Sequence, residues 1–209
     1  MKIFIWIIYL ILCVIDVICA EKKYKRYAKG LLMPMLSFVY VYTCNYQNIQ
    51  IEYLIVLALL FGWMGDVALL NKTKRNIKMG ILTFMLGHIC YILTFLKGFT
   101  VFHASMLIGL IPYVIYAFIF LRKLLPHVKK DMIIPSIIYI MIILIMSISA
   151  YFRFTGDLHI SYCLTLLGSI CFLFSDSILA FQIYAKGSHH GVMILYLLAQ
   201  TLIVISYLL

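Results

Sequence analysis

Apolar runs about as long as a membrane is thick follow one another along almost the entire chain, and short segments between them carry the charges. A helix of about 20 residues spans roughly 30 Å of hydrocarbon. A backbone in lipid must satisfy its own hydrogen bonds, and these runs lack the strict alternation of barrel strands, which leaves helices. The runs predict eight transmembrane helices, at residues 3–20, 30–43, 51–70, 78–96, 100–121, 132–152, 160–184 and 190–209.

The composition favours a membrane over a soluble core. Of the 209 residues, 66% are apolar and 11% are charged, whereas soluble domains carry roughly 25% charged residues. We therefore predict an all-α, polytopic membrane helix bundle that forms a single transmembrane domain over residues 1–209. The first run also resembles a signal peptide, because it ends in Val-Ile-Cys-Ala before Glu21. Its length and the presence of Asp16 favour a retained first helix over cleavage.

Positive charges divide unequally between alternate connections. Of the 17 Lys and Arg residues, only Lys2, Lys97 and Arg153 fall on one side of the predicted bundle. The others lie in the connections on the opposite side, which predicts that both termini are outside and that the basic loops face the cytoplasm, as in a cell-membrane protein. The net charge of +10 then reflects topology and contact with anionic lipid head groups, and we expect no nucleic-acid partner.

Two aspartates interrupt apolar runs, Asp66 in GWMGDVALL and Asp176 in CFLFSDSILAF. Ionisable residues inside a membrane are rare, face the bundle interior or water, and mark functional sites. At 1.5 Å per residue, Asp66 lies about 6 Å and Asp176 about 12 Å from the cytoplasmic ends of their predicted helices. His88 lies about 15 Å deep, and Tyr139 and Gln200 roughly 10–15 Å deep. This common depth predicts a pocket that opens to the cytoplasm.

Each of these residues also has a purely structural interpretation. Asp66 lies near the interface and can pair with a lysine, and His88 can be hydrogen-bonded between helices. Tyrosine and glutamine often form hydrogen bonds between helices, which applies to Tyr91, Tyr139 and Gln200. Small residues let helix backbones approach closely, and we expect this role for Gly62, Gly65, Gly80, Gly87 and Gly168.

Short motifs occur in a fixed order along the chain. They are Lys29-Gly-Leu-Leu-Met-Pro34, GWMGDVALL, Gly80-x3-Phe84-x3-His88-x2-Tyr91, Pro112-Tyr113, Pro135-x3-Tyr139, GSICFLFSDSILAF and Tyr196-x3-Gln200. The series resembles the YhhN-like lysoplasmalogenase family of integral membrane proteins. One departure is Gly30, which follows Lys29 where that family often has proline.

The resemblance implies hydrolysis of the vinyl ether bond of lysoplasmalogens, which releases a fatty aldehyde and a glycerophospho-alcohol. Asp176 is then the candidate acid, because apolar surroundings help a carboxyl group to keep its proton. Asp66, closer to water, is the candidate base or cation stabiliser, and the two roles can be reversed. His88 and Tyr139 are expected to orient water or relay a proton. Substrate contacts are expected from Lys29, which suits the phosphate, and from Tyr91, Ser175 and Gln200.

The same residues leave other functions open. A hydrolase of another lysolipid or ether lipid could bind a divalent metal through Asp66, His88 and Asp176, although no close ligand pair such as HxxxH is present. A small transporter or channel could use the intramembrane aspartates to relay protons or bind ions. A structural partner without chemistry leaves the two buried acids unexplained. We expect a lysolipid substrate and membrane lipids as partners, with no cofactor, no metal and no disulfide. The oligomeric state stays open.

Overall fold

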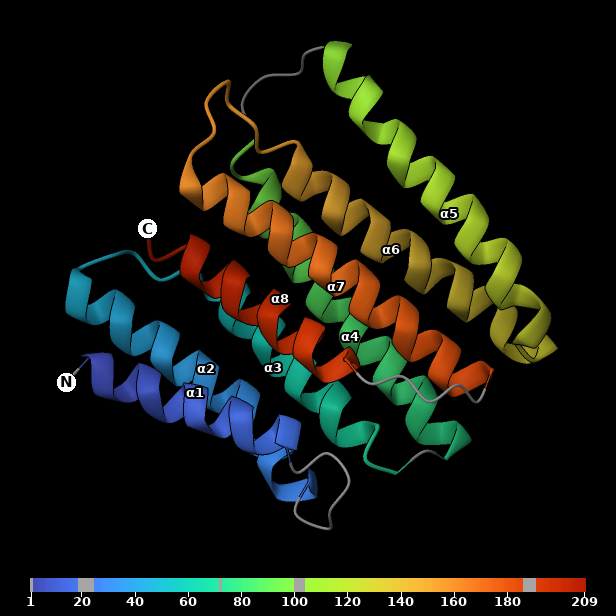
Figure 1. Cartoon of the computed structure of the whole chain (residues 1–209), viewed down its shortest axis with the longest axis horizontal. Helices are drawn as coiled ribbons and strands as arrows, with labels where there is room; N and C mark the ends of the chain where they lie inside the picture. The colour runs from blue at the N-terminus through green and yellow to red at the C-terminus, as the bar shows by residue number, and fades with distance from the viewer. Residues whose placement is uncertain (1, 19–24, 72, 100–103, 186–190) are drawn as a thin grey trace. The chain divides into compact units, whose positions relative to one another are not determined.

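The computed structural model describes residues 2–18, 25–71, 73–99, 104–185 and 191–209. All regular structure in these residues is helical, in agreement with the predicted fold class (Figure 1). The described residues form eight α-helices, with three short 3₁₀ segments between α4 and α6. The α-helices are α1 (Lys2–Ile18), α2 (Lys25–Gln47), α3 (Tyr53–Ala68), α4 (Lys74–Leu96), α5 (Ile111–Leu124), α6 (Ile133–Tyr151), α7 (Ile160–Tyr184) and α8 (Val192–Ser206).

The predicted runs match these helices closely, and the differences have local causes. The predicted run 160–184 coincides with α7, whereas α2 extends beyond its predicted run 30–43 at both ends. The predicted run 100–121 is divided, because a 3₁₀ segment at Ala104–Leu110 precedes α5. Pro112 lies in the first turn of α5, where a missing N–H costs nothing and the fixed φ suits the start of a helix.

Four helical segments are long and apolar enough to cross a membrane, which indicates a membrane protein. They are Lys74–Leu96, Met106–His127, Lys130–Tyr151 and Ile160–Tyr184. Three shorter apolar helices lie at Ile3–Ile18, Tyr53–Ala68 and Val192–Ser206. How many of the eight helices span the membrane stays a prediction, as do the single-domain description and the orientation.

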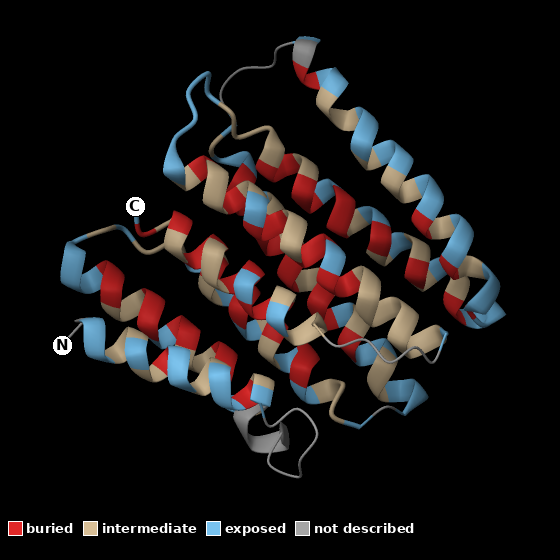
Figure 2. Ribbon diagram, in the orientation of Figure 1, coloured by how far each residue is buried: buried red, intermediate tan, exposed pale blue. Residues whose placement is uncertain are grey.

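The chain forms two compact units, each described here by itself. The first unit contains Met1–Tyr91 and Tyr207–Leu209, and the second contains Ile92–Ser206. In the first unit α2 packs against both α1 and α3. In the second unit α7 packs against α6 and α8, and α5 packs against α6 and α7. Buried positions follow the packed sides of α6 and α7, whereas much of α5 is exposed (Figure 2).

Glycines bring α3 and α4 together in the first unit, as the sequence predicted. A Cβ atom added at Gly65 would lie 2.6 Å from the Phe84 ring. One added at Gly87 would lie 3.2 Å from the Ala58 carbonyl oxygen. A larger residue at either position would press on the facing helix, so glycine permits the close approach of α3 and α4.

Proline and tryptophan form an unpredicted link between α2 and α3. Pro34 lies inside α2, and its missing N–H deprives the carbonyl four residues earlier, at Gly30, of its helical donor. The Trp63 indole of α3 donates a hydrogen bond to this same Gly30 oxygen, Nε1 to O 2.8 Å. A backbone carbonyl left unpaired in lipid is costly. The indole of one helix therefore compensates for the proline of its neighbour.

We expect Trp63→Phe to lower the thermal unfolding midpoint by a few degrees, because it leaves the Gly30 carbonyl without this donor. A hydrogen bond of this kind contributes about 1 kcal/mol, and about 1 kcal/mol corresponds to about 2–4 °C in a chain of this size. The measurement is a thermal melt of the purified protein in detergent. The matched control is Trp6→Phe, since Trp6 contacts the Tyr9 ring in α1. Equal midpoint losses in both variants would mean that only aromatic packing was lost.

In the second unit, polar side chains join the helices at several levels. The Ser147 hydroxyl of α6 lies 3.0 Å from that of Ser169 of α7, and the Tyr113 hydroxyl of α5 lies 3.1 Å from Ser147. At Gly168 an added Cβ would lie 2.8 Å from Ile203 Cγ1. This confirms the close glycine contact predicted there and fixes α8 against α7.

Candidate functional site

The candidate residues fall into two groups, one in each compact unit. Asp66, His88 and Tyr91 belong to the first unit, and Tyr139, Ser175, Asp176 and Gln200 belong to the second. All except the half-buried Tyr139 are buried; Asp66 is 3% exposed and Asp176 4% exposed. Lys29 lies in α2, but its side chain is outside the part of the chain that the structure describes.

Asp176 and Tyr139 are in direct contact. Tyr139 is on α6 and its hydroxyl donates a hydrogen bond to Asp176 Oδ2 on α7, with an O–O distance of 2.5 Å. Distances of about 2.5–2.7 Å are typical of a hydroxyl bonded to a carboxylate. This hydrogen bond holds the Asp176 carboxyl group in a defined orientation through Oδ2. The structure thus joins two of the predicted catalytic residues.

A second tyrosine lies beside this pair and was missed by the sequence analysis. The Tyr116 hydroxyl of α5 donates to Ser177 Oγ at 2.6 Å, and Ser177 Oγ donates to the Leu173 carbonyl of its own helix at 2.6 Å. The Tyr116 ring also meets the Phe174 ring edge to face, with centroids 5.6 Å apart. α5 therefore contacts α7 at the residue that follows Asp176. The polar sequence Ser-Asp-Ser was the available sign that a partner was needed there.

Ser175, which was expected to contact the substrate, is hydrogen-bonded to α8. Its hydroxyl donates to the Val192 carbonyl at the start of α8, Oγ to O 2.9 Å. Successive helical residues point about 100° apart, so Ser175 turns toward α8 while Asp176 turns toward α6. The described contact of Ser175 joins two helices, and its predicted contact with substrate stays a prediction.

Gln200 and Asp176 lie at different heights along the axes of the packed helices, so the predicted common depth is wrong for this pair. Ser175 is level with Val192 through its hydrogen bond, and Gly168 is level with Ala199, whose carbonyl oxygen would lie 3.0 Å from an added Cβ. Gln200 is therefore about eight residues, or about 12 Å, from Asp176 along the bundle. The error arose because each residue was measured from the end of its own helix. α7 extends two turns beyond the point where α8 begins.

Asp66 and His88 are likewise offset within the first unit. Gly65 is level with Phe84, and Gly87 is level with Gly62 and Ala58. Along α4, His88 therefore lies about five residues, or about 8 Å, beyond the point that is beside Asp66, in the direction away from the basic end of the helix. His88 Nδ1 lies 2.6 Å from the Phe84 carbonyl oxygen. Since a carbonyl only accepts, Nδ1 carries the proton, and in the neutral ring Nε2 carries the lone pair.

Tyr91 lies in a cluster of buried tyrosines. It is close enough to Tyr9 of α1 and Tyr40 of α2 to interact with both electrostatically. All three are at most 1% exposed, and the Tyr40 hydroxyl accepts the Glu52 backbone N–H at 3.0 Å. Tyr91 of α4 thus lies near buried tyrosines of α1 and α2. Its predicted role in substrate binding stays a prediction.

Asp16 of α1 is a further buried acid, 1% exposed. The sequence analysis used it only as evidence for a retained first helix, although its place inside an apolar run was the same sign that drew attention to Asp66 and Asp176. Among the described residues, no group of three His, Cys, Asp or Glu side chains could hold a metal ion. The five described cysteines form no disulfide with one another.

A family model described as the YhhN family matches residues 24–207. The chain belongs to the YhhN family. The match covers both candidate groups and every α-helix except α1, so Asp16 and Tyr9 lie outside the YhhN match. No curated protein and no solved structure matches the chain. The motifs that suggested the YhhN family from the sequence all lie within the matched residues.

Proposed function

We propose that this YhhN protein is a lysoplasmalogenase that hydrolyses the vinyl ether bond of a lysoplasmalogen. The YhhN family is associated with this activity. The observation that supports it most directly is the buried Asp176 carboxyl group held by the Tyr139 hydroxyl. A carboxyl group held in a fixed orientation can deliver a proton to the electron-rich β-carbon of a vinyl ether.

The reaction begins with transfer of a proton from Asp176 to the β-carbon of the vinyl ether. This step converts R–CH=CH–O–R′ into the oxocarbenium ion R–CH₂–CH=O⁺–R′ and leaves Asp176 ionised. Oδ1 is assigned as the proton donor, with Oδ2 accepting the Tyr139 hydroxyl. The new carboxylate charge stabilises the cation, and the Tyr139 hydrogen bond stabilises the new carboxylate.

Water then adds to the cation and loses a proton. Asp66 is assigned as the base that takes this proton; like Asp16, it is a buried acid of the first unit, and the family motif GWMGDVALL contains it. The resulting hemiacetal breaks its C–O bond to R′, which takes up a proton as the alcohol. The products are the fatty aldehyde R–CH₂–CHO and a glycerophospho-alcohol. His88 is assigned to water orientation through Nε2, and Lys29 to the substrate phosphate.

We further propose that the reaction takes place in a cell membrane, with the basic loops in the cytoplasm. A single-chain lipid already resides in a leaflet, so it can reach a buried carboxyl group without crossing water. Membrane lipids and the lysolipid itself are the expected partners. Hydrolysis needs no cofactor in this scheme, because both carboxyl groups exchange protons with water.

We expect purified protein in detergent to release fatty aldehyde from lysoplasmenylethanolamine and none from its saturated-ether and acyl analogues. Only the vinyl ether forms an oxocarbenium ion by protonation at carbon. The measurement is aldehyde release without any ion gradient. No product from any of the three substrates would remove the proposal. Ion flux in proteoliposomes without lipid consumption would instead favour a transporter.

A further inference from the structure

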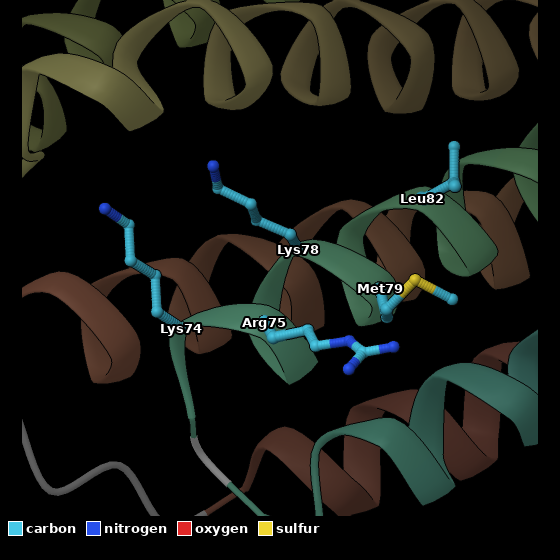
Figure 3. Close-up of a pocket in the computed structure, with 5 residues that line it drawn as sticks. All are labelled: Lys74, Arg75, Lys78, Met79 and Leu82. Carbon is cyan, nitrogen blue, oxygen red and sulfur yellow. The ribbon is translucent and has the colours of Figure 1, made fainter.

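The basic end of α4 carries a groove with charge at one end and apolar side chains at the other. Lys74, Arg75, Lys78, Met79 and Leu82 line it, and its volume is about 580 Å³ (Figure 3). Small-molecule sites typically have volumes of about 300–1,000 Å³, so the groove has room for a phosphate group with its glycerol. Figure 3 shows Lys74 and Lys78 extending to the same side of α4, with Leu82 farther along.

The three cations are placed where a helix favours an anion. They lie in the first five residues of α4, and the first turn of this helix contains no acidic residue. The N-terminal end of a helix is already electropositive, so cations there are unfavourable unless an anion accompanies them. Thr73 Oγ1 accepts the Asn76 N–H at 3.2 Å. Thr73 thus caps this helix end with an uncharged hydroxyl group, and an anion bound at the same end would add stability.

Apolar surface continues from these charges along the helix. Met79 is 46% exposed and Leu82 is 44% exposed. Leu82 lies eight residues after Lys74, or about 12 Å farther into the predicted membrane span. A water-soluble phosphate compound makes no use of such surface. A lipid that puts its phosphate on the cations places its glycerol and first methylene groups against Met79 and Leu82.

This groove is separate from the Asp66 group of the same unit. Gly80 faces α3, since an added Cβ would lie 3.7 Å from the Gly65 carbonyl oxygen. Lys78 and Leu82 each lie two residues from Gly80, and residues two apart point to nearly opposite sides of a helix. The groove therefore opens on the side of α4 that faces away from α3. A substrate held there would not lie against Asp66.

We propose that the groove binds the phosphate head group of an anionic two-chain phospholipid of the bilayer. Lys74 and Lys78, which extend to the same side of α4, hold the phosphate, Arg75 adds a positive charge at the same helix end, and Met79 and Leu82 contact the start of the acyl chains. Each Lys or Arg near an anionic lipid contributes about fivefold to affinity. The bound lipid stabilises the N-terminal end of α4 and anchors it at the membrane surface. This site does not depend on the hydrolase activity.

The test is a titration of the full-length protein, in a nonionic detergent, with fluorescent phosphatidylglycerol. We expect the Lys74→Gln/Arg75→Gln/Lys78→Gln variant to bind roughly 100-fold more weakly than the wild type. The matched control replaces three exposed cations elsewhere, Lys123→Gln/Lys129→Gln/Lys130→Gln, and lowers the net charge of +10 by the same three units. The control should bind as tightly as the wild type. Equal losses in the two triple variants would overturn the proposal, because they would show a general charge effect.

Two further measurements distinguish the proposed phospholipid from the other possible ligands of the groove, a soluble phosphate and the lysolipid substrate. Glycerol-3-phosphate that competes with phosphatidylglycerol at equal concentration would assign the groove to a soluble phosphate and overturn the proposal. The proposal would also be overturned if the triple groove variant had a raised KM for the lysolipid and unchanged binding of phosphatidylglycerol. That result would assign the groove to the path of the substrate. If the triple variant is not monodisperse, Lys78→Gln alone should weaken binding about fivefold. Leu82→Gln should weaken binding of phosphatidylglycerol and leave any binding of glycerol-3-phosphate unchanged. If Leu82→Gln binds phosphatidylglycerol as tightly as the wild type, the proposed contact between Leu82 and the acyl chains is overturned.

Discussion

Replacing Asp176 with Asn lowers the rate of aldehyde release by a factor of about 10² to 10⁴, the range typical of a lost general acid. Asn keeps the size of the side chain and can still accept the Tyr139 hydrogen bond through its carbonyl oxygen. It has no proton acidic enough to transfer to carbon. The loss should therefore fall on kcat rather than on KM. The measurement is steady-state aldehyde release with lysoplasmenylethanolamine.

Two companion variants make the Asp176 result interpretable. Tyr139→Phe removes the hydroxyl that holds Oδ2 and should lower kcat by about tenfold, in line with the loss of a hydrogen bond to a charged group. Ser169→Ala removes a buried hydroxyl of the same helix, hydrogen-bonded to Ser147, about two turns from Asp176. It should retain wild-type activity. If Asp176→Asn and Ser169→Ala have equal effects, helix packing rather than proton transfer explains the loss.

Adding one methyl group at Gly168 destabilises the second unit. The new Cβ of Gly168→Ala would lie 2.8 Å from Ile203 Cγ1 and 3.0 Å from the Ala199 carbonyl oxygen. The carbonyl belongs to the backbone of α8, so the helix itself must move. Overpacking of this kind costs about 1–3 kcal/mol, although alanine is the better helix former. We expect a lower thermal midpoint for the variant protein in detergent.

The same substitution at Gly30 is the matched control. A Cβ there would meet nothing within 4 Å, so Gly30→Ala keeps the propensity gain of up to about 1 kcal/mol without a clash. The two alanines should shift the midpoint in opposite directions. Two shifts of the same sign would contradict the tight α7–α8 contact described for Gly168.

The helices themselves were largely predictable from the sequence, because most runs of apolar residues are long enough to span a membrane and are separated by short charged or polar segments. The run 160–184 matches α7 at both ends, and the glycines predicted to permit close packing do so at Gly65, Gly87 and Gly168. These features depend on residues that are neighbours in the sequence or on the absence of a side chain. Both kinds of information are local.

The relation between helices was not predictable, because nothing local encodes it. The 12 Å offset between Gln200 and Asp176 follows from the contact of Ser175 with Val192, which depends on how α8 packs against α7. The Tyr116–Ser177 bond joins residues 61 positions apart. Pairing a given hydroxyl with its acceptor requires the register of two helices, and several serines on α7 were equally suitable. Asp176 and Tyr139 were both named from the sequence and are hydrogen-bonded in the structure, whereas Tyr116 and the contact of Ser175 with α8 were not predicted.

The bond between Trp63 and the Gly30 carbonyl also affects the order in which the protein can be assembled. When α2 leaves the translocation machinery alone, Pro34 leaves a backbone acceptor without its helical donor, and the indole that satisfies it has not yet been inserted. An unpaired polar group is costly in an apolar environment. We therefore expect α2 and α3 to enter the bilayer together as a helical hairpin, so that a proline that weakens one helix commits the nascent chain to pairing with the next.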